Sequence, residues 1–189
     1  MSTATVPASM GEALRMLESA MEFLADTDAV QMPAEALAEC LRALERADAV
    51  EAVARGRLLA AFDAKDAHLA DGQRTSRTWL VHSLRVTRGQ VAQYKAVEAL
   101  AREHRLLLAG LREGNVITKS VALQLAKWTR SIPAEFREQA EEILVAAARA
   151  GADERALARI AAEIRYRTAP PDPDDERARP EEQAPLPLA

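Results

Sequence analysis

Apolar residues recur at steps of three and four positions along most of the chain, which is the spacing of one face of an α-helix. The first such stretch runs from about Ala8 to Asp26 and carries Leu14, Leu17, Met21 and Leu24 on one side. We expect the first helix of the protein there.

A second apolar pattern begins at Pro33 and continues to about Ala70, with Gly56 as its one strong helix breaker. We therefore expect one helix that is longer than usual for a globular protein, with a slowly drifting apolar stripe. The stripe comprises Leu37, Leu41, Leu44, Val50, Ala54, Leu58, Ala61, Phe62 and Leu69. Such a helix needs cover from other helices of the chain, from a partner copy, or from both.

Capping signals mark the starts of the later helices. Asp71-Gly72 would end the long helix, and Thr75 or Ser76 would cap the next one. Thr87, with Gln90 three residues later, resembles a capping box. The remaining expected helices are one reaching about His104, one from Leu106 to Arg112, one opened by Thr118, one from Ala134 to Ala150 and one from Asp153 to about Arg167.

Three of these later helices have a clear inward face. The predicted inward residues are Val121, Leu125 and Trp128; Phe136, Ala140, Ile143 and Ala147; and Leu157, Ile160 and Ile164. The composition agrees, since 41 alanines, 7 glycines and 4% aromatic residues favour helices over sheets. A chain of 189 residues is long enough for one sizeable core. The sequence therefore predicts an all-α protein, a multi-helix bundle of seven to eight helices.

The C-terminal part of the sequence has a different composition. Six of the nine prolines lie between Pro170 and Pro187 and are mixed with acidic residues. These acidic residues are Asp172, Asp174, Asp175, Glu176, Glu181 and Glu182. With almost no bulky apolar side chains, this segment cannot offset the entropy of ordering. We expect a helical domain over residues 1–167 and a disordered tail over residues 168–189.

The sequence gives no sign of secretion or of a membrane span. Met1 to Met10 has neither the basic residues nor the continuous apolar stretch of a signal peptide, and no run reaches the roughly 18 apolar residues that a span needs. The one cysteine, Cys40, lies on the stripe of the long helix, where we expect it to pack as a small hydrophobic residue. We expect a cytoplasmic protein without a membrane partner.

A pair of short apolar patterns brackets a break at Val86-Thr87 and predicts an embedded helix-turn-helix-like pair. The shared small core would contain Leu80, Leu84, Val86, Val91 and Tyr94. From Gly72 to Arg105 the chain carries seven Lys or Arg against two acidic residues, a charge of +5 in a protein of total charge -4, which leaves -9 for the rest. Such segregation is expected where one face meets a polyanion.

In a DNA-binding reading, the helix that begins at Thr87 would lie in the major groove. Arg88, Gln90 and Gln93, together with Ala92, would face base edges, since Arg pairs with guanine and Gln with adenine. The phosphate contacts would come from Arg74, Arg77, Arg85 and Lys95. The alternative is a helical hairpin whose basic residues are solvated or paired with acidic helices. In either case Arg85 occupies the turn position where glycine is usual.

The histidines form no recognisable site. His68 lies near Asp63, Asp66 and Asp71 in sequence, but helical spacing places them on different faces, so we expect no metal site. His82 and His104 are far in sequence from any cysteine or serine constellation. We expect one of these two to be packed and the other exposed.

The two tryptophans, Trp79 and Trp128, fall in register with apolar stripes, so we expect core packing rather than base stacking. The sequence contains no Gly-rich phosphate loop, Gly-x-Ser-x-Gly elbow, His-Glu-x-x-His motif or paired-cysteine metal motif. We therefore predict no catalytic residue, no cofactor and no small-molecule substrate.

Several stretches resemble a bacterial family known as domain of unknown function 222, the helical N-terminal region of proteins that often end in an HNH nuclease domain. The matching stretches are His68 to Gly72, Thr78 to Leu80, Leu84 to Val91, Leu108 to Gly114, Ile117-Thr118 and Ile132 to Leu144. The resemblance covers roughly residues 15 to 167 and implies a helical domain. The family's nuclease uses histidines and an asparagine around a divalent metal. These are missing from the Pro- and acid-rich end of this chain, so we expect a member that lacks the nuclease.

Two functions follow as hypotheses. The first is a non-catalytic, DNA-associated helical domain that binds through the basic helix-turn-helix-like segment. The second is a scaffold that forms a homodimer or binds protein partners through the long helix from Pro33 to Ala70, with no nucleic-acid binding. A third hypothesis, that the protein is an enzyme, has the least support from the sequence.

Overall fold

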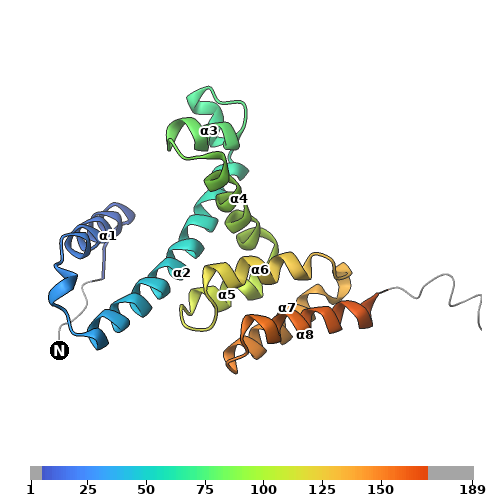
Figure 1. Cartoon of the computed structure of the whole chain (residues 1–189). Helices are drawn as coiled ribbons and strands as arrows, with labels where there is room; N and C mark the ends of the chain where they lie inside the picture. Colours follow the sequence, from blue (N-terminus) through green and yellow to red (C-terminus); the bar gives the residue numbers. More distant parts are fainter. Residues whose placement is uncertain (1–5, 170–189) are drawn as a thin grey trace, which may run out of the picture. The chain divides into compact units, whose positions relative to one another are not determined.

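The computed structural model describes residues 6–169, and its regular secondary structure over this range is helical throughout. In chain order the elements are α1 (Met10–Ala25), η1 (Ala29–Gln31), α2 (Ala34–Ala64), η2 (Ala67–Asp71), α3 (Ser76–Ser83), α4 (Arg88–Glu103), α5 (Arg105–Arg112), α6 (Lys119–Thr129), α7 (Ala134–Arg149) and α8 (Glu154–Thr168) (Figure 1). The predicted all-α fold with up to eight α-helices is confirmed. The predicted tail lies outside the described residues from residue 170 onward.

The chain divides into two compact units, and the division falls within the long helix. The first unit ends at Ala43 and the second begins at Leu44, so α2 contributes to both. The single helical domain over residues 1–167 stays a prediction. No described residue before Ala49 is buried, so the described residues of the first unit form no buried core.

Side-chain caps define where most of the helices begin. In five α-helices the residue before the first turn accepts a hydrogen bond from the backbone N–H three positions later. These caps are Ser9, Thr75, Thr87, Thr118 and Asp153. Thr75 and Thr87 confirm the predicted starts, although the reciprocal capping box forms between Thr75 and Thr78.

The long helix ends earlier than its apolar pattern predicts. We expected it to reach Ala70, but α2 ends at Ala64. Asp66 adopts a left-handed backbone conformation, with φ of 48°, which an α-helix does not accommodate. The chain then forms η2 and leaves it through Gly72, whose φ of 68° is easy for glycine.

The main core lies in the second unit, where α5 to α8 pack together with the middle of α2 and the C-terminal half of α4 (Figure 1). Its fully buried large side chains are leucines from four different helices: Leu100, Leu107, Leu111, Leu125 and Leu144. The predicted inward residues Leu125 and Leu157 are buried, while Ile160 and Ile164 are partly buried against this core. Most of the apolar surface that leaves water does so here.

Helix α7 presents a different face to the core from the one predicted. Ala140 is buried as expected, but Phe136 and Ile143 are 40% and 43% exposed. Leu144 and Val145 take their place in the core. The sequence pattern was ambiguous because this alanine-rich helix carries apolar residues on more than one side.

A buried polar pair joins α7 to the junction of α4 and α5. Nδ1 of His104 lies 2.5 Å from Oε1 of Glu141, and the two side chains are 3% and 4% exposed. Because each group satisfies the other away from water, we assign the pair a structural role. His82, in contrast, is exposed. The expectation of one packed and one exposed histidine is confirmed.

Both tryptophans are partly buried against apolar clusters, as predicted. Trp128 packs on the main core. Trp79 lies with its ring centroid 4.4 Å from that of Phe62, and its indole N–H donates to Asp71 at 2.6 Å. With its polar atom already bonded and its ring already packed, Trp79 acts as a structural side chain.

Gly56 marks the closest approach of α2 to α4. A Cβ atom added at Gly56 would lie 2.7 Å from the carbonyl oxygen of Val97 and 3.3 Å from the Cβ of Ala101. The position therefore accepts no side chain unless the helices separate. Gly56, which the sequence analysis treats as a helix breaker, is thus required for the close packing of α2 against α4.

We predict that Gly56→Ala destabilises the protein by about 1–3 kcal/mol, because the added methyl group meets a backbone carbonyl that cannot rotate away. The matched control is Gly89→Ala in α4, where the nearest neighbour of the new Cβ is 3.9 Å away and the higher helix propensity of alanine should maintain or raise stability. Urea unfolding of both variants measures the effect. Equal stability of the two variants would contradict the close crossing.

Candidate nucleic-acid interface

Helices α3 and α4 form the predicted helix-turn-helix-like pair around a small core of their own. Leu80 and Val91 are buried together with Leu59 of α2, and Trp79, Val81, Val86 and Tyr94 pack around them. Leu84 was predicted in this core, but it is the C-cap of α3 and is 43% exposed. The pair is thus anchored on the C-terminal part of α2.

The turn between the two helices contains a strained residue. Arg85 has φ of 54°, in the left-handed region, and its side chain is exposed. An L-residue with a Cβ pays about 1–2 kcal/mol for this conformation, whereas glycine does not. Asp66 has a similar φ of 48°, so the strain at Arg85 is informative only together with the exposed positive charge that this position carries.

The four predicted phosphate-contacting or base-contacting arginines of this corner are all exposed: Arg74, Arg77, Arg85 and Arg88. Within residues 6–169, none of them forms an ion pair with a carboxylate. Several arginines elsewhere do pair, among them Arg105 with Glu138 at 3.0 Å and Arg149 with Glu113 at 2.8 Å. The corner therefore presents charge that the described chain does not neutralise.

Two of these arginines border one hollow between α3 and α4. The hollow has a volume of about 330 Å³ and is lined by Arg77, Thr78, Val81 and His82 of α3 and by Arg88 and Val91 of α4. Cations eleven positions apart in sequence thus border one concave surface with an apolar floor. Our sequence reasoning missed His82 as a member. His82 lies four residues after Thr78, so the two side chains share one face of α3, and this spacing could have identified His82 from the sequence.

The outward face of α4 carries small side chains and one amide. The exposed residues are Gly89, Ala92, Gln93 and Ala96. Gln90 is partly buried, and its backbone N–H donates a hydrogen bond to the side chain of the N-cap residue Thr87. Small side chains let a helix approach a surface closely, and alanine can contact a thymine methyl group. Of the two glutamines that we predicted to face base edges, Gln93 is exposed to solvent and Gln90 is partly buried.

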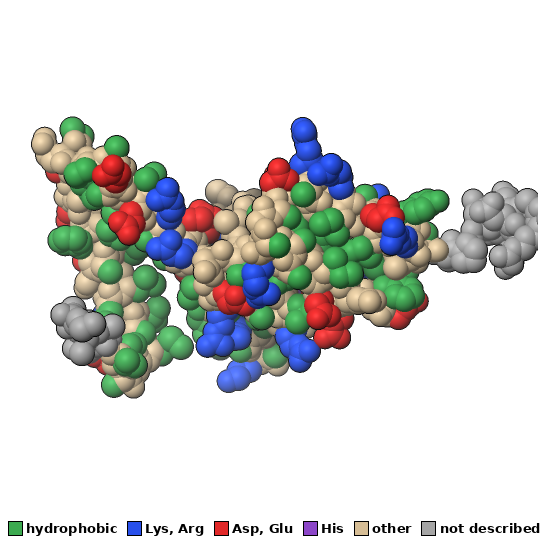
Figure 2. Space-filling model, turned by 90° about the horizontal axis from the view of Figure 1, so that it is seen from below, with side chains coloured by type: hydrophobic (Ala, Val, Ile, Leu, Met, Phe, Trp, Pro, Cys, Tyr) green, Lys and Arg blue, Asp and Glu red, His purple; other side chains and the backbone are tan. Residues whose placement is uncertain are grey.

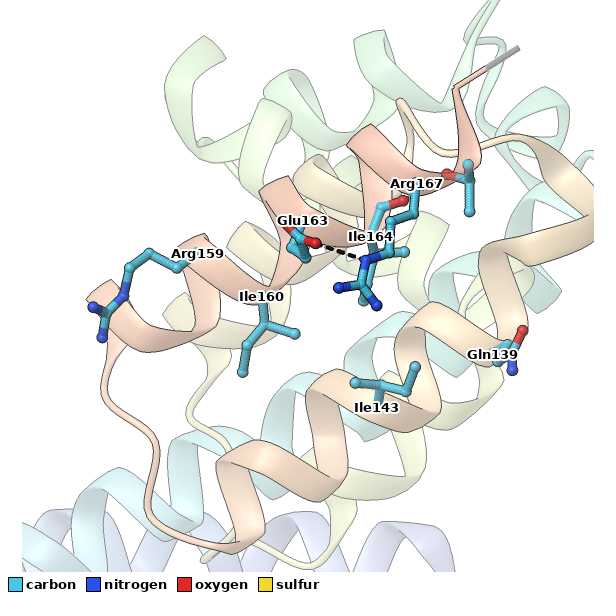
Figure 3. Close-up of a pocket in the computed structure, with 8 residues that line it drawn as sticks. Gln139, Ile143, Arg159, Ile160, Glu163, Ile164 and Arg167 are labelled. Carbon is cyan, nitrogen blue, oxygen red and sulfur yellow. Dashed lines mark hydrogen bonds and ion pairs between the residues drawn. The ribbon is translucent and has the colours of Figure 1, made fainter. Parts of the chain in front are cut away.

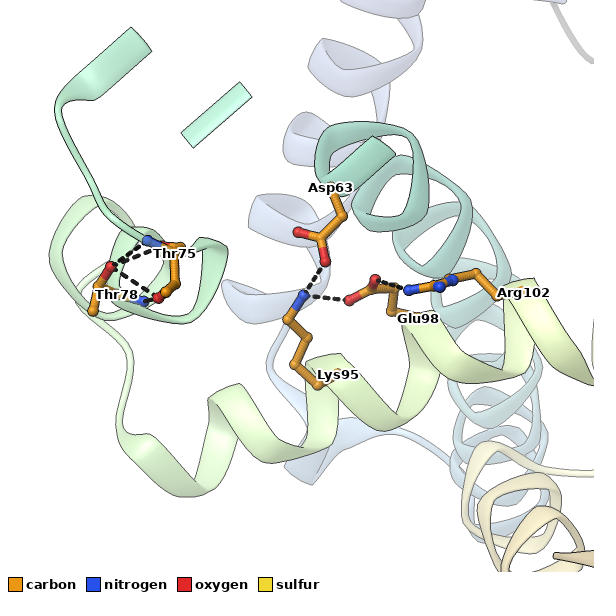
Figure 4. A network of polar contacts seen from close by, with 6 residues as sticks. All are labelled: Asp63, Thr75, Thr78, Lys95, Glu98 and Arg102. Atoms are coloured by element: carbon orange, nitrogen blue, oxygen red, sulfur yellow. Dashed lines mark hydrogen bonds and ion pairs between the residues drawn. The ribbon is translucent and has the colours of Figure 1, made fainter. Parts of the chain in front are cut away.

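Lys95 lies apart from the exposed arginines. Its Nζ donates to Asp63 of α2 at 2.5 Å and to Glu98 at 2.6 Å, and its side chain is only 15% exposed (Figure 4). Arg102 extends the network to the other oxygen of Glu98 at 3.5 Å. We predicted Lys95 as a phosphate contact. Because two carboxylates already hold its charge, we leave it out of the interface and assign it to the joint between α2 and α4.

The charge network also shifts the ionisation of Asp63. Partial burial by itself would raise the pKa of this carboxyl group. The hydrogen bonds from Lys95 and Ser76 and the positive charge of Lys95 outweigh burial and hold the pKa below its ordinary value of 3.8. Asp63 therefore carries a full negative charge at neutral pH, opposite the ammonium group of Lys95.

A second surface feature is an apolar groove between α7 and α8. Ile143 of α7 faces Ile160 and Ile164 of α8 across a hollow of about 570 Å³, and an ion pair between Glu163 and Arg167 lies at its rim (Figure 3). Figure 2 shows hydrophobic side chains gathered over these two helices with charged groups at the margin. The three isoleucines offer van der Waals contact.

Metal-ligand geometry is not formed by the candidate side chains near His68. His68 is buried, with no hydrogen-bond partner for its Nδ1 atom, and within the described range no three His, Cys, Asp or Glu side chains are grouped to hold a metal ion. Cys40 is partly buried on α2. Among the helices between residues 6 and 169, none combines the length and apolar character that a bilayer crossing requires.

We predict that Asp63→Asn lowers the free energy of unfolding by about 1.5–3 kcal/mol at pH 7, since it removes a charge-assisted hydrogen bond from a partly buried lysine. The pKa of Asp63 is lowered by folding, so its stabilising effect is complete above pH 3.8 and is lost as the pH falls below that value. Urea unfolding at pH 7 and at pH 3 should therefore show the variant and the wild type converging in acid.

Asp48→Asn is the matched control, because Asp48 pairs with Lys119 at a more exposed position, with side chains 41% and 34% exposed. We expect a loss below about 1 kcal/mol there. A gap between wild type and Asp63→Asn that stays constant from pH 7 to pH 3 would contradict the ionised pair.

We compared the chain with known protein families, curated proteins and solved structures. No family model, curated protein or solved structure matches the chain.

Proposed function

We propose that this protein is a non-catalytic helical domain that binds DNA through the exposed face of α3 and α4. The DNA-facing residues are Arg74, Arg77, Arg85, Arg88, Gln90 and Gln93. The observation that carries the proposal is the hollow in which Arg77 and Arg88, from two helices, flank an apolar floor beside His82. Convergent cations around a concave surface are suited to phosphate oxygens.

Charge distribution supports the same surface. Three of the seven Lys and Arg side chains between Gly72 and Arg105, namely Lys95, Arg102 and Arg105, pair with carboxylates. The other four, Arg74, Arg77, Arg85 and Arg88, are exposed without an ion pair within the described residues, on a protein whose net charge is -4. A basic face on an acidic protein orients the molecule toward a polyanion while the remaining surface is repelled. Nonspecific attraction to a weakly charged partner would need no such segregation.

The shape of α4 supports contact with bases as well as with phosphates. Its N-terminal turn is exposed and capped by Thr87, and its outward side chains are small apart from Arg88 and Gln93. A helix N-terminus carries partial positive charge that favours nearby phosphate. Gln93 has the donor and acceptor pair that matches adenine in the major groove.

The resemblance to domain of unknown function 222 supports an association with nucleases, in which this domain would contribute binding and not cleavage. That family pairs a helical region with an HNH nuclease, and the stretches that carry the resemblance include Leu84 to Val91, the turn of the proposed interface. We infer that the helical region holds DNA, since a metal-dependent nuclease needs its substrate positioned.

Because Arg88 lines the same hollow as Arg77, we now place it at a phosphate together with Arg74, Arg77 and Arg85. With four phosphate contacts, we predict that DNA affinity falls with salt along a log–log slope of about -3 to -4. The double variant Arg77→Gln/Arg88→Gln should bind more weakly and flatten the slope to about -2, since each lost phosphate contact removes roughly one unit. Fluorescence anisotropy with duplex DNA from 50 to 200 mM salt measures both.

The control is Arg130→Gln/Arg155→Gln, which makes the same change of charge at two exposed arginines that form no ion pair within the described residues. Its slope should remain near that of the wild type. Absence of binding at 50 mM salt by the folded protein would remove the proposal, and equal losses in the two double variants would show a diffuse charge effect in place of a site.

We further predict that Arg85→Gly stabilises the protein by about 1 kcal/mol and weakens DNA binding, because glycine relieves the left-handed strain while a phosphate contact is lost. Asp66→Gly is the control: Asp66 has φ of 48° and its side chain makes no cap hydrogen bond. It should gain similar stability without losing affinity. If Arg85→Gly bound DNA as well as wild type, the strain at Arg85 would have no functional explanation in DNA contact.

A further inference from the structure

Helix α1 carries a continuous row of exposed apolar side chains, which we term the α1 seam. The row consists of Met10, Leu14, Leu17, Met21 and Leu24, which are 65%, 56%, 49%, 49% and 43% exposed. Their spacing alternates between four and three residues, so they project from one narrow side of the helix. The side chains of this row are too large and too aligned to be an ordinary scatter of surface residues.

The first unit has no interior into which the α1 seam could turn. None of the described residues up to Ala43 is buried, and α1 itself contains no buried side chain. A helix of 16 residues is marginal in water without tertiary packing, even with a good cap such as Ser9. The seam therefore needs a surface that covers it.

The spacing of the seam identifies a second α1 helix as the surface that fits. An apolar repeat averaging 3.5 residues keeps one side of a helix facing a partner along its whole length, which is the requirement for two helices that coil around each other. An irregular groove in another protein would not require this regular alternation.

The residues that flank the seam favour a parallel pair. Four of the five flanking positions are Gly11, Ala13, Ala20 and Ala25, so the backbones can approach closely, and only Glu18 is charged. In a parallel pair the two Glu18 side chains lie on opposite sides of the interface and avoid each other. In an antiparallel pair centred on Leu17 they would lie close together and repel.

The area of the seam sets the strength of the association. Five half-exposed Leu and Met side chains from each copy bury on the order of 1,000 Å² in total, which is the lower limit for a specific interface. We propose that α1 is a dimerisation helix, which pairs in parallel with α1 of a second copy of this chain through the α1 seam. With this area, the dimer dissociates in about the micromolar range.

This assignment differs from the self-association predicted through the long helix. Of the predicted stripe, Phe62 packs on Trp79. The structure contradicts the rest of the prediction, because α2 buries a different face, formed by Ala49, Ala52, Val53, Gly56 and Leu59, while large stripe residues stay exposed: Leu41, Leu44, Val50, Leu58 and Leu69. The spacing of those exposed residues departs from the alternation of four and three after Leu44, whereas the α1 seam keeps that alternation along its whole length. The inference is also independent of DNA binding, because it concerns a helix outside the proposed interface.

Analytical ultracentrifugation of the full chain from about 1 to 200 μM tests the proposal. The weight-average mass should rise from 20.6 kDa toward twice that value. Leu17→Glu, at the centre of the seam, should remain monomeric at every concentration. Phe23→Glu is the matched control, because Phe23 is 75% exposed and lies on the opposite side of α1, so this variant should dimerise like the wild type.

Circular dichroism of each variant checks that the helices are retained, and a conservative variant, Leu17→Met, should restore dimerisation. A wild-type protein that stays monomeric across the range overturns the proposal and means that the seam is covered within its own chain or by a different protein. Equal loss of dimer in Leu17→Glu and Phe23→Glu also overturns it.

A cysteine cross-link tests the parallel arrangement separately. With Cys40→Ser removing the natural thiol, Leu24→Cys should form a disulfide-linked dimer under mild oxidation, since the C-terminal ends of a parallel pair lie together. In an antiparallel pair these ends lie far apart, so a mass that doubles without cross-linking would refute the parallel arrangement.

Discussion

The ammonium group of Lys95 lies between the carboxylates of Asp63 and Glu98, and the placement of α3 and α4 on the long helix depends on this contact. The three side chains are only 15%, 26% and 4% exposed, so removing one partner would leave a charge in poorly solvated surroundings. The same contact fixes how α4 is rotated, because Lys95 points toward α2. It follows that Gln93, two residues before Lys95 and on the opposite side of α4, is turned outward.

Much of the fold could be predicted from the sequence because its determinants are local. Helix starts follow from caps such as Thr75, Thr87 and Asp153, each of which acts within three residues of its own position. The helix-turn-helix-like pair was predictable for the same reason, since Leu80 and Val91 flank the turn that joins their helices. These features need no knowledge of distant segments.

The parts that could not be predicted depend on contacts between distant segments. Lys95 has its partner Asp63 thirty-two residues away, so its engagement is invisible in a charge count. Ile143 faces solvent because Leu144 and Val145 fill the core beside α5 and α8, a choice that an alanine-rich helix leaves open. The end of α2 depends on the left-handed conformation of Asp66, which aspartate adopts only occasionally.

The proposed interface and the proposed dimerisation helix lie in different units, and a protein built this way would bring two DNA-binding corners together. The DNA-binding claim is tested most directly by NMR, with duplex DNA added to the labelled full chain at about 50 mM salt. The account predicts that amide signals from Arg74 to Gln93 shift first, while those of α7 and α8 remain in place. Shifts confined to α7 and α8, or no shifts at all, would contradict it.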